Sequence, residues 1–127
     1  LEVPDGIGYA GVMLDCIEGM QSKEGRSLVL SVKNNGAIPF LKDEDVVEIT
    51  CNVSEKGIIP VAAKNIPEDC KGLICLIKAY ERLTVEAIEK KDAGIGARAL
   101  AIHPLVNSYS IARELVKDYT EAYGKLF

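Results

Sequence analysis

The spacing of hydrophobic positions changes twice along the chain. Over residues 8–20 they recur every three or four positions, which predicts a helix with one apolar face. That face is formed by Tyr9, Val12, Met13, Cys16, Ile17 and Met20. Over 27–33 and 46–53 they alternate with polar residues, which predicts two strands buried on one face. Residues 58–62 predict a third strand at the edge of the sheet. From residue 67 onward the spacing of three and four returns.

Three helices are predicted in the second half of the chain. The longest covers 67–91, and Pro67 suits its first position because a missing N–H costs nothing there. A shorter helix, 93–103, is interrupted by Gly94 and Gly96. The last follows a cap at Asn107 or Ser108. Its apolar face is formed by Ile111, Ala112, Leu115, Tyr119, Ala122 and Tyr123. Strands followed by a run of helices are typical of an α+β fold, with helices packed on a small antiparallel sheet. We expect one domain over 1–127.

The connection between the first two strands contains Asn34-Asn35-Gly36, a strong turn signal because these residue types tolerate positive φ. Pro39 lacks an amide hydrogen, so the chain cannot pair straight back as a clean hairpin. An open loop followed by a returning strand is therefore predicted. The two amides can donate and accept hydrogen bonds, and Gly36 permits close backbone approach. Asn34, Asn35 and Gly36 are the local candidates for a functional site, although turn chemistry alone explains them nearly as well.

Composition narrows the possible partners. The net charge is −4, from 15 basic and 19 acidic side chains, and the basic residues are scattered. Binding of nucleic acid or of an anionic membrane surface needs clustered Lys and Arg, so neither is expected as a main partner. No apolar run approaches the roughly 20 residues that span a bilayer.

The cysteines and the histidine favour structural roles. Cys70 and Cys75 lie on the predicted long helix at a spacing that does not suit a zinc knuckle. All four cysteines are expected to be reduced core residues of a cytosolic protein. His103 precedes Pro104 at a helix end, which favours a capping or packing role over catalysis.

The chain lacks a nucleotide-binding signature and begins as if inside a longer protein. No G-x-G-x-x-G follows a strand, and Gly94-Ile95-Gly96 lies between helices, where it is interpreted as a break in a helical hairpin. Leu1-Glu2-Val3-Pro4 carries no initiator Met and no signal-like segment. We expect an excised domain.

An ordered set of motifs resembles the C-terminal domain of family-4 glycoside hydrolases, most closely the 6-phospho-β-glucosidases. No single motif is specific; their order and spacing carry the resemblance, from about Tyr9 to Phe127. The runs are Val29–Pro39, Asp45–Val53, Gly57–Pro60, Lys71–Leu73, Lys78–Ala87 and His103–Val106.

This resemblance implies an NAD-dependent and divalent-metal-dependent glycosidase, usually with manganese. It implies an N-terminal NAD-binding domain outside this chain and a fold similar to the C-terminal half of lactate and malate dehydrogenases. The implied reaction is oxidation at C3 of the sugar, elimination, addition of water and reduction, an exception to two-carboxylate glycosidases. The resemblance also implies that catalytic, nucleotide-binding and metal-binding residues lie upstream, so the fragment alone should be inactive.

The resemblance places the Asn34-Asn35-Gly36 loop on the substrate side of the cleft. One departure concerns the phosphate: many relatives have Arg-Gly-Gly before the first helix, whereas this chain has Asp5-Gly6. Exchanging a cation for Asp5 disfavours a dianion, which puts a phosphorylated substrate in doubt.

Several alternatives stay open. The chain could belong to an α-specific or non-phosphorylated glycosidase of the same scaffold, or to the substrate half of a 2-hydroxy-acid dehydrogenase. From another class, it could be a non-catalytic oligomerisation module that uses the 67–91 helix and the last helix. A cytoplasmic homo-oligomer acting on phosphorylated disaccharides is the leading hypothesis.

Overall fold

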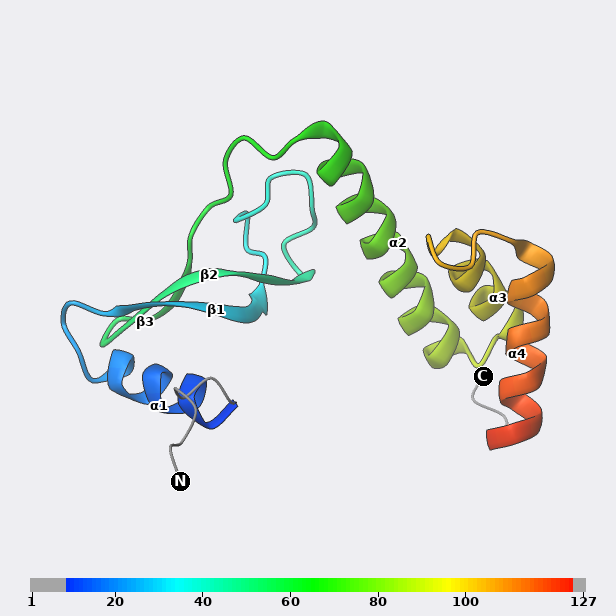
Figure 1. The fold of residues 1–127 in the computed structure, drawn as a ribbon, viewed down its shortest axis with the longest axis horizontal. Coiled ribbons are helices and arrows are strands. Elements are labelled where there is room, and N and C mark those ends of the chain that lie inside the picture. The colour runs from blue at the N-terminus through cyan, green and yellow to red at the C-terminus, as the bar shows by residue number, and fades with distance from the viewer. Residues whose placement is uncertain (1–8, 125–127) are drawn as a thin grey trace, which may run out of the picture. The chain divides into compact units, whose positions relative to one another are not determined.

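A computed structural model of the chain describes residues 9–124. The chain forms two compact units, Leu1–Asn65 and Ile66–Phe127 (Figure 1). Each unit is considered by itself. The first contains α1 (Tyr9–Met20), β1 (Arg26–Lys33), β2 (Val46–Ser54) and β3 (Gly57–Pro60). The second contains α2 (Glu68–Lys90), α3 (Ala93–Ile102) and α4 (Tyr109–Tyr123). The predicted α+β class with a small antiparallel sheet is confirmed.

The sheet of the first unit is antiparallel in the order β1-β2-β3. Its register places Leu28 opposite Cys51 and Val32 opposite Val47, so the alternating apolar positions share one face. On that face Val47, Cys51 and Val53 are buried. The sheet pairing ends at Pro60, and the Val61 N–H still donates to the Thr50 carbonyl oxygen.

Helix α1 reaches the sheet through a glycine. A Cβ at Gly19 would lie 2.9 Å from the Val53 carbonyl oxygen and 3.1 Å from its Cγ1, so only glycine permits this approach. The apolar residues expected to bury α1 are largely in solvent, Met13 at 64% exposed and Ile17 at 47%.

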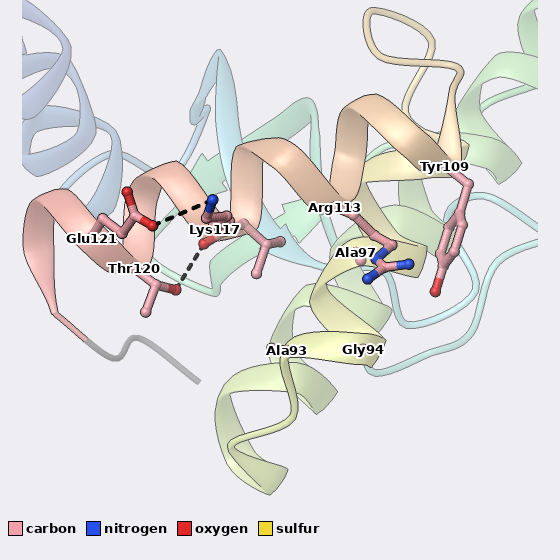
Figure 2. A pocket seen from close by; sticks show the side chains of 9 residues that line it. Ala93, Gly94, Ala97, Tyr109, Arg113, Lys117, Thr120 and Glu121 are labelled. Atoms are coloured by element: carbon pink, nitrogen blue, oxygen red, sulfur yellow. Dashed lines mark hydrogen bonds and ion pairs between the residues drawn. The ribbon is translucent and has the colours of Figure 1, made fainter.

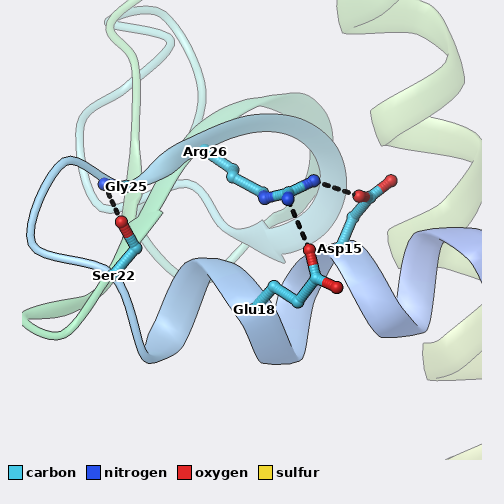
Figure 3. A network of polar contacts seen from close by, with 5 residues as sticks. All are labelled: Asp15, Glu18, Ser22, Gly25 and Arg26. Atoms are coloured by element: carbon cyan, nitrogen blue, oxygen red, sulfur yellow. Dashed lines mark hydrogen bonds and ion pairs between the residues drawn. The ribbon is translucent and has the colours of Figure 1, made fainter.

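Arg26 provides the polar link between α1 and β1. Its guanidinium pairs with Asp15 through Nη1 and with Glu18 through Nη2 (Figure 3). The three side chains are about half exposed, so each pair contributes only modestly to stability, by roughly 0.2–1 kcal/mol. The planar fork nevertheless fixes the direction in which α1 leaves the sheet edge.

In the second unit, α3 packs against both α2 and α4. The predicted interruption of α3 is wrong: the helix runs continuously from Ala93 to Ile102. The Asp92 carboxylate accepts the N–H groups of Gly94 (2.8 Å) and Ile95 (3.1 Å), which starts the helix just before its glycines. Gly96 is buried, so it permits close packing.

Helix α4 buries small residues and leaves its aromatic ones outside. Ser108 caps it by accepting the Ile111 N–H, which decides between the two predicted caps. Ala112 and Val116 are buried, whereas Tyr119 and Tyr123, predicted to lie on the packed face, are exposed and stack on one another at 6.2 Å. Within the described residues no helix is long and apolar enough to cross a bilayer.

Two glycine substitutions test this packing in opposite directions. Gly19→Ala should destabilise the protein by about 1–3 kcal/mol, because its new methyl group meets the β2 backbone. Gly72→Ala, where an added Cβ meets nothing within 4 Å, should stabilise α2 by up to about 1 kcal/mol. Urea unfolding followed by circular dichroism measures the free energy of unfolding of both variants. Equal stability of the two variants would contradict the close contact between Gly19 and β2.

Candidate functional site

The candidate site is the connection 34–45 between β1 and β2. Its base is closed by backbone hydrogen bonds that continue the sheet: the Asn34 N–H donates to the Asp45 carbonyl oxygen at 2.7 Å. One step further, the Asn35 N–H donates to the Asp43 carbonyl oxygen at 3.1 Å. The loop is therefore open, as predicted, and its two ends are held together by the strands.

The Asn34 side chain builds the interior of this loop. Its Nδ2 donates to the carbonyl oxygens of Ile38 (3.1 Å), Leu41 (3.4 Å) and Lys42 (3.2 Å). Its Oδ1 accepts the Ile38 N–H at 2.7 Å. Asn34 is 0% exposed, so its amide is fully engaged by the loop's own backbone.

A buried carboxylate and three apolar residues complete the support. Asp45 Oδ2 accepts the Lys42 N–H at 2.9 Å, and Asp45 is 8% exposed. The Ala63 N–H donates to the Ala37 carbonyl oxygen at 2.8 Å, which ties the loop to the segment after β3. The residues of the loop that bury apolar side chains are Ala37, Ile38 and Leu41.

Asn35 and Gly36 stand at the outer surface of this rigid base. Their φ values are 42° and 81°, the left-handed region that asparagine and glycine tolerate best. Both are exposed, and a Cβ at Gly36 would meet nothing within 4 Å. The three predicted residues thus divide into one that shapes the loop and two that face outward. An exposed amide on a held backbone, beside open space, can bind a hydroxyl or an anionic oxygen.

His103 takes the capping and packing role expected of it, with Tyr80 as its packing partner. Their rings meet edge to face with centroids 4.7 Å apart, and both residues are half-buried. His103 Nδ1 accepts the Leu105 N–H at 3.2 Å just beyond α3. The imidazole therefore helps to order the residues that directly follow the C-terminus of α3.

The cysteines are all free, but only part of the prediction for them holds. Cys51 is buried, and burial raises the pKa of its thiol above the ordinary value, which a backbone hydrogen bond at Leu30 partly offsets. Cys70 and Cys75 are exposed on α2, so they are not core residues in this unit. Across residues 9–124 no group of three or more His, Cys, Asp or Glu could hold a metal ion.

Helix α2 has a charged face in solvent. Lys90 Nζ lies 2.6 Å from Glu86 Oε1, and this exposed pair lowers the pKa of Glu86 and raises that of Lys90. The two groups stabilise one another on the helix surface and converge on no cavity residue.

Sequence reasoning did not single out a cavity of about 400 Å³ between α3 and α4 (Figure 2). Small residues of α3 form one wall, and a row of α4 side chains at four-residue spacing forms the other. The row ends in an ion pair, with Lys117 Nζ 3.7 Å from Glu121 Oε1. The four-residue spacing of the α4 side chains could have predicted that they share one helix face. It could not have predicted that the alanines and the glycine of α3 lie opposite them and leave a cavity. The lining comprises Ala93, Gly94, Ala97, Tyr109, Arg113, Val116, Lys117, Thr120 and Glu121.

Comparison with known proteins identifies the class of domain. Residues 5–106 match the family model described as "Family 4 glycosyl hydrolase C-terminal domain". The chain therefore belongs to the family-4 glycosyl hydrolases, as the motifs predicted.

Its relatives are phosphoglucosidases of both linkages. The chain is 29% identical to the probable 6-phospho-beta-glucosidase of Bacillus subtilis (strain 168), over 97% of this chain and 28% of that protein. A 6-phospho-alpha-glucosidase from gut microorganisms, solved with NAD and Mn²⁺, superposes with a TM-score of 0.83 at 26% identity, covering 94% of this chain and 28% of that one. The Thermotoga maritima 6-phospho-beta glucosidase, solved with NAD and glucose-6-phosphate, superposes with a TM-score of 0.80 at 29% identity. This match covers 94% of this chain and 29% of that one. The chain thus spans less than a third of these relatives.

The Asn34 network makes a sharp mutational prediction. Asn34→Asp keeps the shape and the acceptor for the Ile38 N–H, but it places a carboxylate against three carbonyl oxygens. Folding stability should fall by about 2–4 kcal/mol near neutral pH. In urea unfolding, Asn35→Gly serves as the control and should be nearly neutral, because this exposed residue already has a positive φ. A stable Asn34→Asp variant would contradict the structural role.

Proposed function

We propose that the whole protein is a cytoplasmic 6-phospho-β-glucosidase that requires NAD and a divalent metal such as Mn²⁺. The observation that carries this proposal is the superposition on a 6-phospho-beta glucosidase solved with NAD and glucose-6-phosphate, over 94% of this chain. The reaction is the oxidation, elimination, addition and reduction sequence implied by the family.

This chain contributes substrate contacts to that reaction. The Asn35 amide and the open space beside Gly36 face outward from a base that the buried Asn34 holds rigid. Because the backbone beneath the Asn35 amide is already ordered, only its side chain loses conformational freedom when it binds a sugar hydroxyl. The family resemblance assigns the ligands of the metal to segments upstream of this chain.

An α-linked phosphoglucoside is the second candidate substrate. The relative with the TM-score of 0.83 is a 6-phospho-alpha-glucosidase, and its identity to this chain is similar to that of the β-specific one. The Asp5-Gly6 departure from Arg-Gly lies outside the described residues. Because an aspartate in place of a cation disfavours a phosphate dianion, the sequence at Asp5 favours a non-phosphorylated glycoside as a further alternative.

The whole protein should also form a homo-oligomer. Exposed apolar side chains on α2 (Leu73 at 53%) and on α4 (Tyr123 at 73%) support contacts through these helices. A purely non-catalytic oligomerisation module would show the same association without any glycosidase activity.

An activity assay on the purified whole protein tests the proposed function. With NAD and Mn²⁺ it should hydrolyse p-nitrophenyl 6-phospho-β-glucoside faster than the α-linked and the non-phosphorylated counterparts. Removal of NAD or chelation of the metal should abolish activity, because the route begins and ends with hydride transfer. Faster turnover of either counterpart would select that alternative, and turnover without NAD would contradict the reaction type.

The loop's share in substrate binding has its own test. Asn35→Ala should lower kcat/KM about tenfold in the whole protein, as expected for loss of one well-placed hydrogen bond. The control is Asn107→Ala, because Asn107 is also exposed and has nearly the same φ, 43° against 42°. Equal effects of the two substitutions would assign the loss to backbone strain and remove Asn35 from the site.

A further inference from the structure

The cavity between α3 and α4 has two walls of different chemistry. On the α3 side, Ala93, Gly94 and Ala97 carry no side chain larger than a methyl group (Figure 2). Val116 of α4 adds a further apolar surface. All the lining residues belong to the second unit. The volume of about 400 Å³ lies in the range of sites that bind small organic ligands.

Helix α4 brings charge to this apolar surface. Figure 2 shows the Arg113 guanidinium and the Tyr109 hydroxyl, one helical turn apart, pointing toward the α3 side of α4. Both side chains are exposed, so a ligand can reach them from solvent. No carboxylate among the described residues pairs with Arg113. Lys117 already has a carboxylate neighbour, because its Nζ lies 3.7 Å from Glu121 Oε1. The described lining therefore carries one uncompensated positive charge.

Other donors on the lining are already engaged. The Gly94 N–H donates to the Asp92 carboxylate at 2.8 Å, so the first turn of α3 is capped from within the chain. The Thr120 hydroxyl donates to the Val116 carbonyl oxygen at 2.7 Å. An anion in the cavity would therefore be held mainly by the guanidinium and the phenol of α4.

We propose that this cavity binds a small monocarboxylate with an apolar body. The planar guanidinium of Arg113 can donate two parallel hydrogen bonds to one carboxylate. A single negative charge matches the one uncompensated positive charge, whereas a phosphate dianion would leave a negative charge unmatched beside Glu121. The small residues of α3 leave room for an alkyl or aryl group, which gains from leaving water. The lining shares no residue with the candidate site at 34–45, so the inference does not rest on the proposed function.

Saturation-transfer NMR on the purified whole protein tests the proposal, with 3-phenylpropionate as the probe. The carboxylate should bind, and 3-phenylpropanamide, which has the same body without the charge, should bind at least about tenfold more weakly. Inorganic phosphate at equal concentration should not displace the probe. Absence of binding would overturn the proposal. Equal binding of the amide would overturn the role of the charge, and displacement by phosphate would overturn the role of the apolar body.

Variants locate the probe in the cavity. Arg113→Gln should weaken binding about tenfold through loss of the charged hydrogen bonds. Ala93→Leu keeps every charge but fills the cavity, and it should weaken binding several-fold. The matched control is Arg98→Gln, because Arg98 is an exposed arginine of α3 outside the lining, and it should bind as the unmodified protein does. Circular dichroism verifies that each variant folds. Equal losses for the two arginines, or unchanged binding in Ala93→Leu, would overturn the proposal.

Competition separates this cavity from the proposed substrate site. With NAD and saturating glucose 6-phosphate present, 3-phenylpropionate should bind with unchanged affinity, and its displacement would assign it to the substrate site and overturn the proposal. A protein that hydrolyses no phosphoglucoside but binds the probe through Arg113 would refute the proposed function and leave the carboxylate site standing. An active enzyme that does not bind the probe would do the opposite.

Discussion

The candidate site depends on one buried amide. Asn34 joins backbone atoms of Ile38, Leu41 and Lys42, which belong to a loop too irregular to satisfy them by strand pairing. Without that amide, the Leu41 carbonyl oxygen and the Ile38 N–H would need water or rearrangement, since a buried polar group without a partner is costly. The carbonyl oxygens of Ile38 and Lys42 would each keep one backbone N–H. The left-handed tip at Asn35 and Gly36 has a defined position because this interior is saturated. Rigidity of the tip follows from the chemistry beneath it.

Much of this fold could be predicted from periodicity. All three strands and all four helices occur within a few residues of their predicted positions, because alternation and three-to-four spacing report directly on which face is buried. The turn signal also located the candidate loop. It could not separate Asn34 from Asn35, because neighbouring asparagines have the same local propensity, and only the long-range partners Leu41 and Lys42 make one of them structural.

Burial itself was predicted less well than secondary structure. Met13, Ile17, Tyr119 and Tyr123 were assigned to packed faces and are largely exposed. In each helix a small residue makes the close contact instead, Gly19 in α1 and Ala112 in α4. A hydrophobic pattern indicates which side chains would gain from burial. It does not identify the surface that buries them, which can belong to another part of the protein or to a partner.

The tip of the loop and helix α1 are linked by a single strand. β1 begins with Arg26, which holds α1, and it ends immediately before Asn34, which builds the loop. Its eight residues separate these two anchors by about 25 Å. The pairing of Leu28 with Cys51 and of Val32 with Val47 fixes which face each residue takes, and a slip of one position would reverse every face. The half-buried apolar alternation of β1 therefore sets the position of the Asn35 amide and of α1 together.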